Sequence, residues 1–196
     1  MAGMMVGVAC AAACGGSIHY DYDYSKEPDP RKSEYVIGVA DHLSIRVWKN
    51  PDLSTEASVR PDGTITMPLL GDLRADGRTP SQLKEDITKQ LQRYVRDEGA
   101  VVTIAVTGVN SYSFTVSGNV EHPGVFAQTK YVTVLDAVQL AGGPNRFSSA
   151  AETKIFRRDR ASGKMRVIPI NYPAVLEGTQ PEANLALLPG DQVYVP

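Results

Sequence analysis

The chain has 196 residues, of which 42% are hydrophobic and 21% charged, a composition that excludes wholesale disorder. Twenty basic residues against 22 acidic ones give a formal net charge of -2, so the chain lacks the positive charge typical of nucleic-acid-binding proteins. It contains no run of about 20 apolar residues, and no ordinary transmembrane helix is predicted. The length suits one large domain or two small ones.

The first 14 residues differ from the rest of the chain. From Met4 to Ala13 every residue is apolar or Gly, as in the hydrophobic region of a signal peptide. The small residues before Cys14 resemble the lipobox of bacterial lipoproteins, in which the Cys carries the lipid. We therefore expect residues 1–14 to be a signal peptide with lipidation at Cys14, or alternatively at Cys10. The other interpretation is an unstructured tail with two idle thiols.

Residues 15–33 predict a flexible tether. The segment contains Gly-Gly, Pro28 and Pro30 among mostly polar residues, and it shows no apolar periodicity. Tyr and Asp alternate over residues 20–24. We interpret this alternation as part of a solvated linker, with an adhesive surface as the alternative.

Alternation and turn residues predict strands in the next part of the chain. From Leu43 to Val47 apolar side chains occupy every second position, the period of a half-buried strand. Pro61-Asp62-Gly63 stands between Val59 and Ile65 and indicates a hairpin.

A helix signal follows at Thr79. Thr79 is a good N-cap, Pro80 suits the first helical position, and Gln82 completes a capping box. The apolar face expected for this helix is formed by Leu83, Ile87 and Leu91. Another strand is expected over residues 102–106.

A second structural unit is expected from Tyr112 onward. Its predicted elements are a strand at 114–116, a turn at 122–124, a helix capped by Thr133 and stopped by Gly142, a hairpin joining 155–158 to 165–168, and a last strand at 192–195. Strands and helices in this order predict an α+β fold.

No motif typical of catalysis or metal binding occurs. His19, His42 and His122 stand far apart in unrelated contexts. The sequence has no HExxH pair, nucleophile elbow, phosphate-binding loop or dinucleotide fingerprint. We therefore expect no catalytic residues, no metal and no cofactor.

Several charged residues along the chain also have simple interpretations. Asp62, Asp72 and Asp191 adjoin Gly, which is ordinary turn chemistry. Arg157, Arg158 and Arg160 form a basic spot that Asp159 interrupts, and we interpret this spot as a solvated hairpin.

Two sets of motifs, in a fixed order, carry a family resemblance. The first runs through residues 35–48, 50–54, 59–63, 65–68 and 70–71 and ends in the helix after Thr79-Pro80. It resembles the polysaccharide export domain of outer-membrane polysaccharide export proteins, the Wza-like group. The second comprises residues 116–120, 123–126, 135–137, 141–143, 188–191 and 193–196. It resembles a soluble-ligand-binding β-grasp (SLBB) domain.

The resemblance implies two small α+β domains, an export domain over residues 34–111 and an SLBB domain over 112–196. One departure concerns the turn before the first strand. The family usually has Pro-Gly-Asp there, whereas this chain reads Gly38-Val39-Ala40-Asp41. The family also continues to a C-terminal membrane-crossing helix, and we expect this chain to be a short form without it.

The implied function is that of a ring-forming, lipid-anchored subunit at the periplasmic face of the outer membrane, lining a non-catalytic conduit for capsular or exopolysaccharide. Its implied partners are identical subunits, an inner-membrane polysaccharide copolymerase, the exported polysaccharide and a separate outer-membrane pore protein, with no nucleic acid. The turn residues expected to shape subunit contacts or the lumen are Asp41, Asp62, Gly63, Gly118, Pro123, Gly124, Gly190 and Asp191. The alternative is a periplasmic adaptor that binds glycan or a partner without forming a pore. An enzyme acting on glycan would need a pair of carboxylates that the sequence does not indicate.

Overall fold

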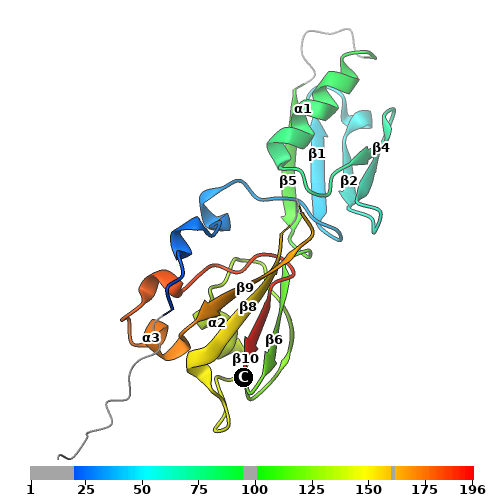
Figure 1. The fold of residues 1–196 in the computed structure, drawn as a ribbon. Helices are drawn as coiled ribbons and strands as arrows, with labels where there is room; N and C mark the ends of the chain where they lie inside the picture. The colour runs from blue at the N-terminus through cyan, green and yellow to red at the C-terminus, as the bar shows by residue number, and fades with distance from the viewer. Residues whose placement is uncertain (1–19, 95–100, 160–161) are drawn as a thin grey trace, which may run out of the picture.

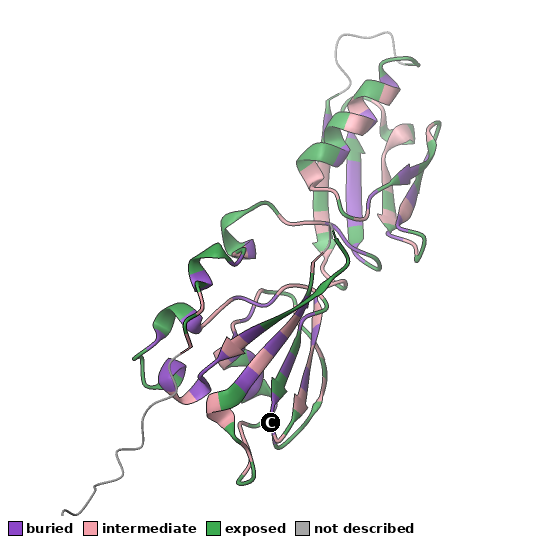
Figure 2. Ribbon diagram, viewed as in Figure 1, coloured by how far each residue is buried: buried purple, intermediate pink, exposed green. Residues whose placement is uncertain are grey.

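The computed structural model describes residues 20–94, 101–159 and 162–196. These residues form two α+β units that lie end to end (Figure 1). Each unit has its own cluster of buried apolar side chains. Figure 2 shows that buried and exposed positions alternate along the strands, as expected for sheets with one face in a core. The predicted α+β class with two small domains is confirmed.

The first unit contains a three-stranded antiparallel sheet in the order β2-β1-β5 and a separate two-stranded hairpin, β3-β4. Its elements are β1 (His42–Val47), β2 (Thr55–Ser58), β3 (Thr64–Met67), β4 (Gly71–Arg74), α1 (Pro80–Leu91) and β5 (Val102–Gly108). A short 3-10 turn, Pro51–Leu53, separates β1 from β2. The helix α1 packs against β5, and its buried side chains join the core of this unit.

The predicted helix after Thr79 is confirmed. The Thr79 hydroxyl accepts a hydrogen bond from the Gln82 backbone N–H, and the Gln82 side chain accepts one from the N–H of Thr79. Such a cap stabilises a helix by about 1 kcal/mol. Leu83, Ile87 and Leu91 are at most 1% exposed, so the expected apolar face is the buried one.

The tight turn expected between Val59 and Ile65 is confirmed, but the named strands on either side of it do not pair with each other. The Gly63 N–H donates to the Arg60 carbonyl at 2.8 Å, and the Arg60 N–H donates to the Thr64 carbonyl at 2.9 Å. However, β2 pairs with β1, whereas β3 pairs with β4. The flanking strands therefore enter different sheets. Their alternation could not specify which distant strand each one would bind.

The second unit is a five-stranded mixed sheet in the order β7-β6-β10-β8-β9. Its elements are β6 (Ser113–Gly118), β7 (Gly124–Ala127), α2 (Val134–Leu140), β8 (Thr153–Arg158), β9 (Met165–Ile170), α3 (Tyr172–Leu176) and β10 (Gln192–Val195). The last strand lies in the middle, parallel to β6 and antiparallel to β8. Thr133 caps α2 as expected, and it does so through a capping box with Asp136.

The segment from residue 20 to residue 33 is not a solvated linker. It forms two short 3-10 helices, Tyr24–Lys26 and Pro30–Lys32, and packs on the second unit. Tyr24 is 7% exposed, and its hydroxyl donates to the Pro169 carbonyl at 2.8 Å. The aromatic rings of the Tyr-Asp alternation supply apolar area, which explains the packing. The hydroxyls of Tyr20 and Tyr24 donate to backbone carbonyls, and that of Tyr22 donates to the Glu27 carboxylate.

The predicted signal peptide, including Cys10 and Cys14, lies outside the described residues. In the described ranges no helix combines the length and the apolar character needed to cross a bilayer.

Candidate functional site

The chain crosses between the two units twice, and Asp41 binds both crossings. Asp41 is fully buried directly before β1. One carboxylate oxygen accepts the Tyr35 hydroxyl at 2.6 Å, the Gly38 N–H at 2.8 Å and the Ser111 hydroxyl at 3.0 Å. The other accepts the N–H groups of Asn110 and Ser111, both at 2.8 Å. We call residues 35–41 together with 110–111 the joint.

Two physical features keep the joint tight. Burial opposes the charge of Asp41, but hydrogen bonds from Tyr35 and from the backbone N–H groups outweigh it and lower the pKa of this carboxyl. Burial and the bond to Asp41 raise the pKa of Tyr35. A Cβ at Gly38 would lie 2.5 Å from the Cβ of Ser111, so only Gly allows the two crossings to approach this closely.

A second buried aspartate, Asp191, lies directly before β10. It is 2% exposed, and one oxygen accepts the Leu188 N–H at 2.8 Å. Arg157, 1% exposed, donates to Asp191 at 2.6 Å through Nη2 and at 3.1 Å through Nε. The other guanidinium nitrogen donates to Glu27 at 3.0 Å. We call Glu27, Arg157 and Asp191 the ion cluster.

The ion cluster fastens the N-terminal segment to the second unit. Glu27 comes from the segment before the first domain, and it also accepts the Tyr22 hydroxyl at 2.6 Å and Arg166 at 3.1 Å. Burial raises the pKa of Asp191, and the hydrogen bonds from Arg157 oppose that shift. These partners in turn raise the pKa of Arg157 despite its burial.

The interpretation of Arg157 as part of a solvated hairpin is therefore wrong, and Asp191 is more than a turn residue. The sequence did contain a signal. Thr153, Ile155 and Arg157 occupy alternate positions of β8, and Thr153 and Ile155 are fully buried. Period-two alternation would have placed Arg157 on the core side as well.

The two aspartate turns share one backbone geometry. The Asp41 N–H donates to the Gly38 carbonyl at 3.3 Å, and the Asp191 N–H donates to the Leu188 carbonyl at 3.1 Å. The third residue has a left-handed φ in both turns, +71° at Ala40 and +83° at Gly190. The turn usually made by Pro-Gly-Asp is thus kept in the first unit, with Ala in the strained position.

The other predicted turn residues lie apart from these two turns. Asp62 is exposed and accepts the Thr64 N–H at 3.0 Å, next to Gly63. Gly118 ends β6, where a Cβ would lie 2.0 Å from the Val195 carbonyl oxygen. Pro123 and Gly124 form the turn between β6 and β7, and Pro123 is exposed. The structure therefore does not assemble the eight predicted residues into one site.

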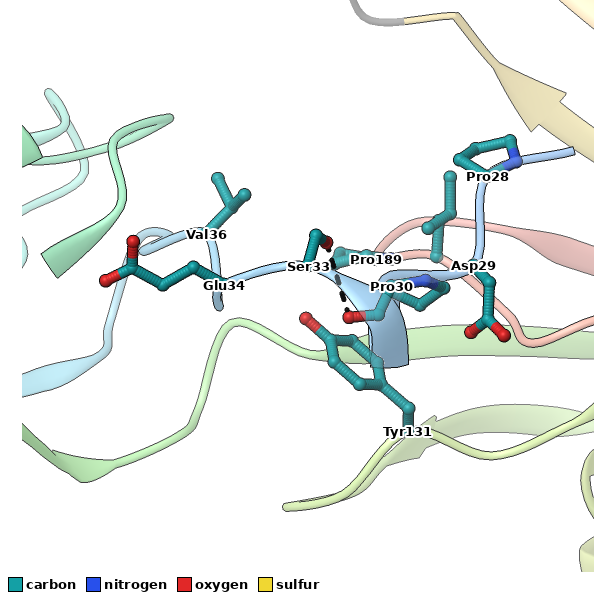
Figure 3. A pocket seen from close by; sticks show the side chains of 9 residues that line it. Pro28, Asp29, Pro30, Ser33, Glu34, Val36, Tyr131 and Pro189 are labelled. Carbon is teal, nitrogen blue, oxygen red and sulfur yellow. Dashed lines mark hydrogen bonds between the residues drawn. The ribbon is translucent and has the colours of Figure 1, made fainter. Parts of the chain in front are cut away.

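A hollow of 160 Å³ lies between the N-terminal segment and the second unit. It is lined by Pro28, Asp29, Pro30, Ser33, Glu34, Val36, Tyr131, Leu188 and Pro189. Figure 3 shows its two carboxylates at opposite ends and pointing apart. Asp29 binds Arg31 at 2.8 Å, and Glu34 accepts the Ser81 N–H at 2.9 Å. The hollow is smaller than a usual ligand pocket, and its carboxylates do not face a common substrate.

A larger hollow of 370 Å³ beside α2 is lined by Gln128, Lys130, Tyr131, Val132, Asp136, Gln139 and Leu140. Its one carboxylate, Asp136, caps α2 by accepting the Thr133 N–H at 2.8 Å. Within the described ranges no three His, Cys, Asp or Glu side chains are grouped closely enough to hold a metal ion. Neither of these two hollows brings two carboxylates together over a common space.

Sequence comparison matches both units to known domains. Residues 29–107 match the family described as polysaccharide biosynthesis/export protein, and residues 113–169 match the SLBB domain. The chain belongs to the polysaccharide export family. The first match runs from the N-terminal segment to β5, and the second runs from β6 to β9. The central strand β10 follows the second match and completes its sheet.

Curated relatives of this export-family chain have related names. It is 32% identical over 151 residues to the exopolysaccharide production protein ExoF of Rhizobium meliloti. This aligned region covers 70% of this chain and 34% of the relative. The chain is 28% identical over 189 residues to the EPS I polysaccharide export outer membrane protein EpsA of Ralstonia solanacearum. The aligned region covers 84% of this chain and 48% of that relative. The capsule polysaccharide export protein BexD of Haemophilus influenzae is 27% identical over 127 residues, covering 55% of this chain and 32% of the relative. The chain therefore spans less than half the length of these relatives.

Proposed function

We propose that the chain is a subunit of a polysaccharide export channel at the outer membrane and that it acts as a non-catalytic conduit component. The observation that carries the proposal is the export domain followed by an SLBB domain, each matched to a folded unit. Relatives named as polysaccharide export proteins of the outer membrane support it. Conduction of a hydrated polymer requires a polar passage, and it does not require reacting groups.

We propose that identical subunits close a ring through head-to-tail contacts, since such contacts generate rings when the rotation closes. The joint supports this role because it ties both chain crossings to one buried carboxylate. A subunit that holds its two units in a defined arrangement can repeat the same contact around a ring. The strands at the sheet edges, among them β7 and β9, offer unpaired backbone groups for neighbouring subunits.

The predicted contact residues divide by exposure. Asp62, Pro123 and Gly190 are exposed and Gly124 is half-buried, and these four remain our candidates for subunit contacts or the lumen. Gly63 is buried, so it can act only through the turn that it forms with Asp62. Asp41 and Asp191 are buried, so any influence on assembly acts through the turns that they hold. Gly118 lacks a side chain that would collide with Val195, so it allows β6 to lie close to the last strand, β10.

The proposed location is the periplasmic face of the outer membrane, with a lipid on Cys14 or, alternatively, Cys10. The proposed partners are an inner-membrane polysaccharide copolymerase, the exported polysaccharide and a separate outer-membrane pore protein. Acyl chains contribute about 0.8 kcal/mol per buried methylene, which anchors a protein without a spanning helix. Cys14→Ser should release the protein from membranes, with Cys10→Ser as the matched control.

The decisive experiment is deletion of the gene followed by measurement of surface polysaccharide. Loss of surface polysaccharide, with accumulation inside the cell, and its restoration by the full chain are expected. Native mass spectrometry of the full chain then separates the two candidate roles. A closed oligomer supports the conduit, whereas a strict monomer under all conditions favours the alternative, an adaptor that binds glycan or a partner protein.

A further inference from the structure

The five-stranded sheet of the second unit is covered by a helix on one face. Side chains of β6, β8 and β10 pack there with α2, and Figure 1 shows this helix behind the sheet. The side chains that alternate with the buried ones point to the opposite face, which we call the open face. On the open face Val125 is 72% exposed, Val167 50% and Tyr194 37%, so this face meets solvent.

A continuous row of side chains crosses the open face. The strand register aligns Val125, Thr115, Gln192, Phe156 and Val167 on five neighbouring strands. At about 4.8 Å between strands the row is about 19 Å long, enough for several linked sugar rings. The row is polar in the middle, at Thr115 and Gln192, and apolar at both ends.

The row and its neighbours on β6 and β10 supply aromatic rings and hydrogen-bonding groups. The rings of Phe156 and Tyr194 are 6.3 Å apart and tilted by 53°. The Gln192 amide donates to the Ser117 hydroxyl at 3.0 Å, which orients the amide oxygen. Ligand sites combine apolar and aromatic surface with a few placed polar groups. Aromatic rings cover the C–H faces of sugars, while amide and hydroxyl groups bond to sugar hydroxyls.

The charged side chains that the strands place on the open face are basic. Lys154 and Arg158 flank Phe156 on β8. The carboxylates of the ion cluster lie on the covered side, where they bind Arg157. Because the whole chain has a formal charge of -2, the basic character of this face is local. Such a face is complementary to a polymer that carries acidic groups.

We propose that the open face binds an acidic polysaccharide, with sugar rings along the row and acidic groups toward Lys154 and Arg158. This inference rests on the proposed function, which supplies polysaccharide as the polymer the chain meets. A protein partner fits less well, since the core of a protein interface is apolar and Thr115 and Gln192 occupy the centre of the row.

The test is calorimetric titration of the full chain with hyaluronan oligosaccharides, an acidic probe, and with dextran oligosaccharides, a neutral one. Hyaluronan should bind more tightly, and its binding should weaken with added salt. Replacing both rings in Phe156→Ala/Tyr194→Ala should weaken hyaluronan binding about tenfold or more. Lys154→Gln/Arg158→Gln should remove the preference for the acidic probe.

Two matched controls lie outside the open face. Phe147 is 70% exposed in the loop before β8, so Phe147→Ala removes an exposed ring elsewhere. Lys84 and Lys89 are exposed on α1, so Lys84→Gln/Lys89→Gln removes the same charge elsewhere. Both controls should bind hyaluronan like the unchanged protein. Circular dichroism verifies that each variant is folded, and Phe156→Tyr, which keeps the ring, should retain binding.

Three results would overturn the inference: no hyaluronan binding by the unchanged protein, binding unaffected by the open-face variants, or loss of self-association in these variants with glycan binding intact. The last result would make the open face a subunit contact. Failure of the proposed function is distinguishable. If hyaluronan binds through the open face and export is still normal after gene deletion, the export role is rejected. The proposal that the open face binds glycan would remain supported.

Discussion

The two buried aspartates show two ways to support the same turn. Asp41 and Asp191 each precede a strand and accept the N–H of the residue three positions earlier. Asp41 is held by neutral donors, and its pKa is lowered, whereas Asp191 is held by a guanidinium, and its pKa is raised by burial. The first turn thus relies on hydroxyl and backbone N–H donors, whereas the second relies on a guanidinium that it shares with Glu27.

The difference also separates the roles of the turns. Asp41 connects segments within the joint, so it governs how the two units are held together. Asp191 reaches Glu27 through Arg157, so it governs the docking of the N-terminal segment.

The largest loss of stability is expected when the cation at the centre of the ion cluster, Arg157, is removed. Arg157→Met leaves the carboxylates of Asp191 and Glu27 with reduced compensation in the core and should lower the free energy of unfolding by about 3–5 kcal/mol. Denaturant titration of the full chain measures this loss, and hydrogen exchange locates it in the second unit. The neighbouring exposed residue provides the control, since Arg158→Met should change stability by less than about 0.5 kcal/mol. A loss below about 1 kcal/mol in Arg157→Met would show that the ion cluster is not a strong tie.

A smaller loss of stability is expected when the carboxylate of the first turn, Asp41, is replaced. Asp41→Asn removes the charge and places an amide where five donors converge, which should cost about 2–3 kcal/mol. Denaturant titration measures the loss, and hydrogen exchange should rise in the joint, at Gly38 and Ser111. Asp62→Asn, at an exposed turn, is the matched control. Equal exchange at the joint in both variants would contradict the role of Asp41.

Acid should affect the two turns in opposite directions. Because the pKa of Asp41 is lowered on folding, its contribution is present above the unfolded pKa of about 3.9 and is lost as the pH falls through the folded value. The pKa of Asp191 is shifted in the opposite direction, upward. Its contribution to stability is therefore present at low pH and is lost as the pH rises. Stability measured from about pH 5 to pH 2 should fall less steeply in Asp41→Asn than in the unchanged protein. Identical slopes would reject this assignment.

The smallest expected effect concerns the left-handed position of each turn. Ala40→Gly should stabilise the protein by about 0.5–1 kcal/mol, because Gly adopts the φ of +71° without the Cβ penalty. Gly190→Ala should destabilise by a similar amount. A Cβ at Gly190 would meet no atom within 4 Å, so its cost is purely conformational. Thermal unfolding of both variants checks the pair, and changes of the same sign would contradict it.

Features that depend on residues close together in the chain could be predicted before the fold was known. The cap of α1 involves Thr79 and Gln82, three positions apart, and the turn before β10 closes over three positions, so both could be predicted. The order of motifs likewise indicated the family and the two α+β domains, although it gave no reason to place Ala in a strained turn.

Contacts between segments that are distant in the chain could not be predicted in this way. Arg157 binds partners 34 and 130 positions away in the chain, and alternation alone cannot name them. The pairing of β3 with β4, the central place of β10, the packing of residues 20–33 and the open face depend on the same long-range choice. Local propensity sets the shape of each element, whereas burial of apolar area and pairing of buried charge select its neighbours.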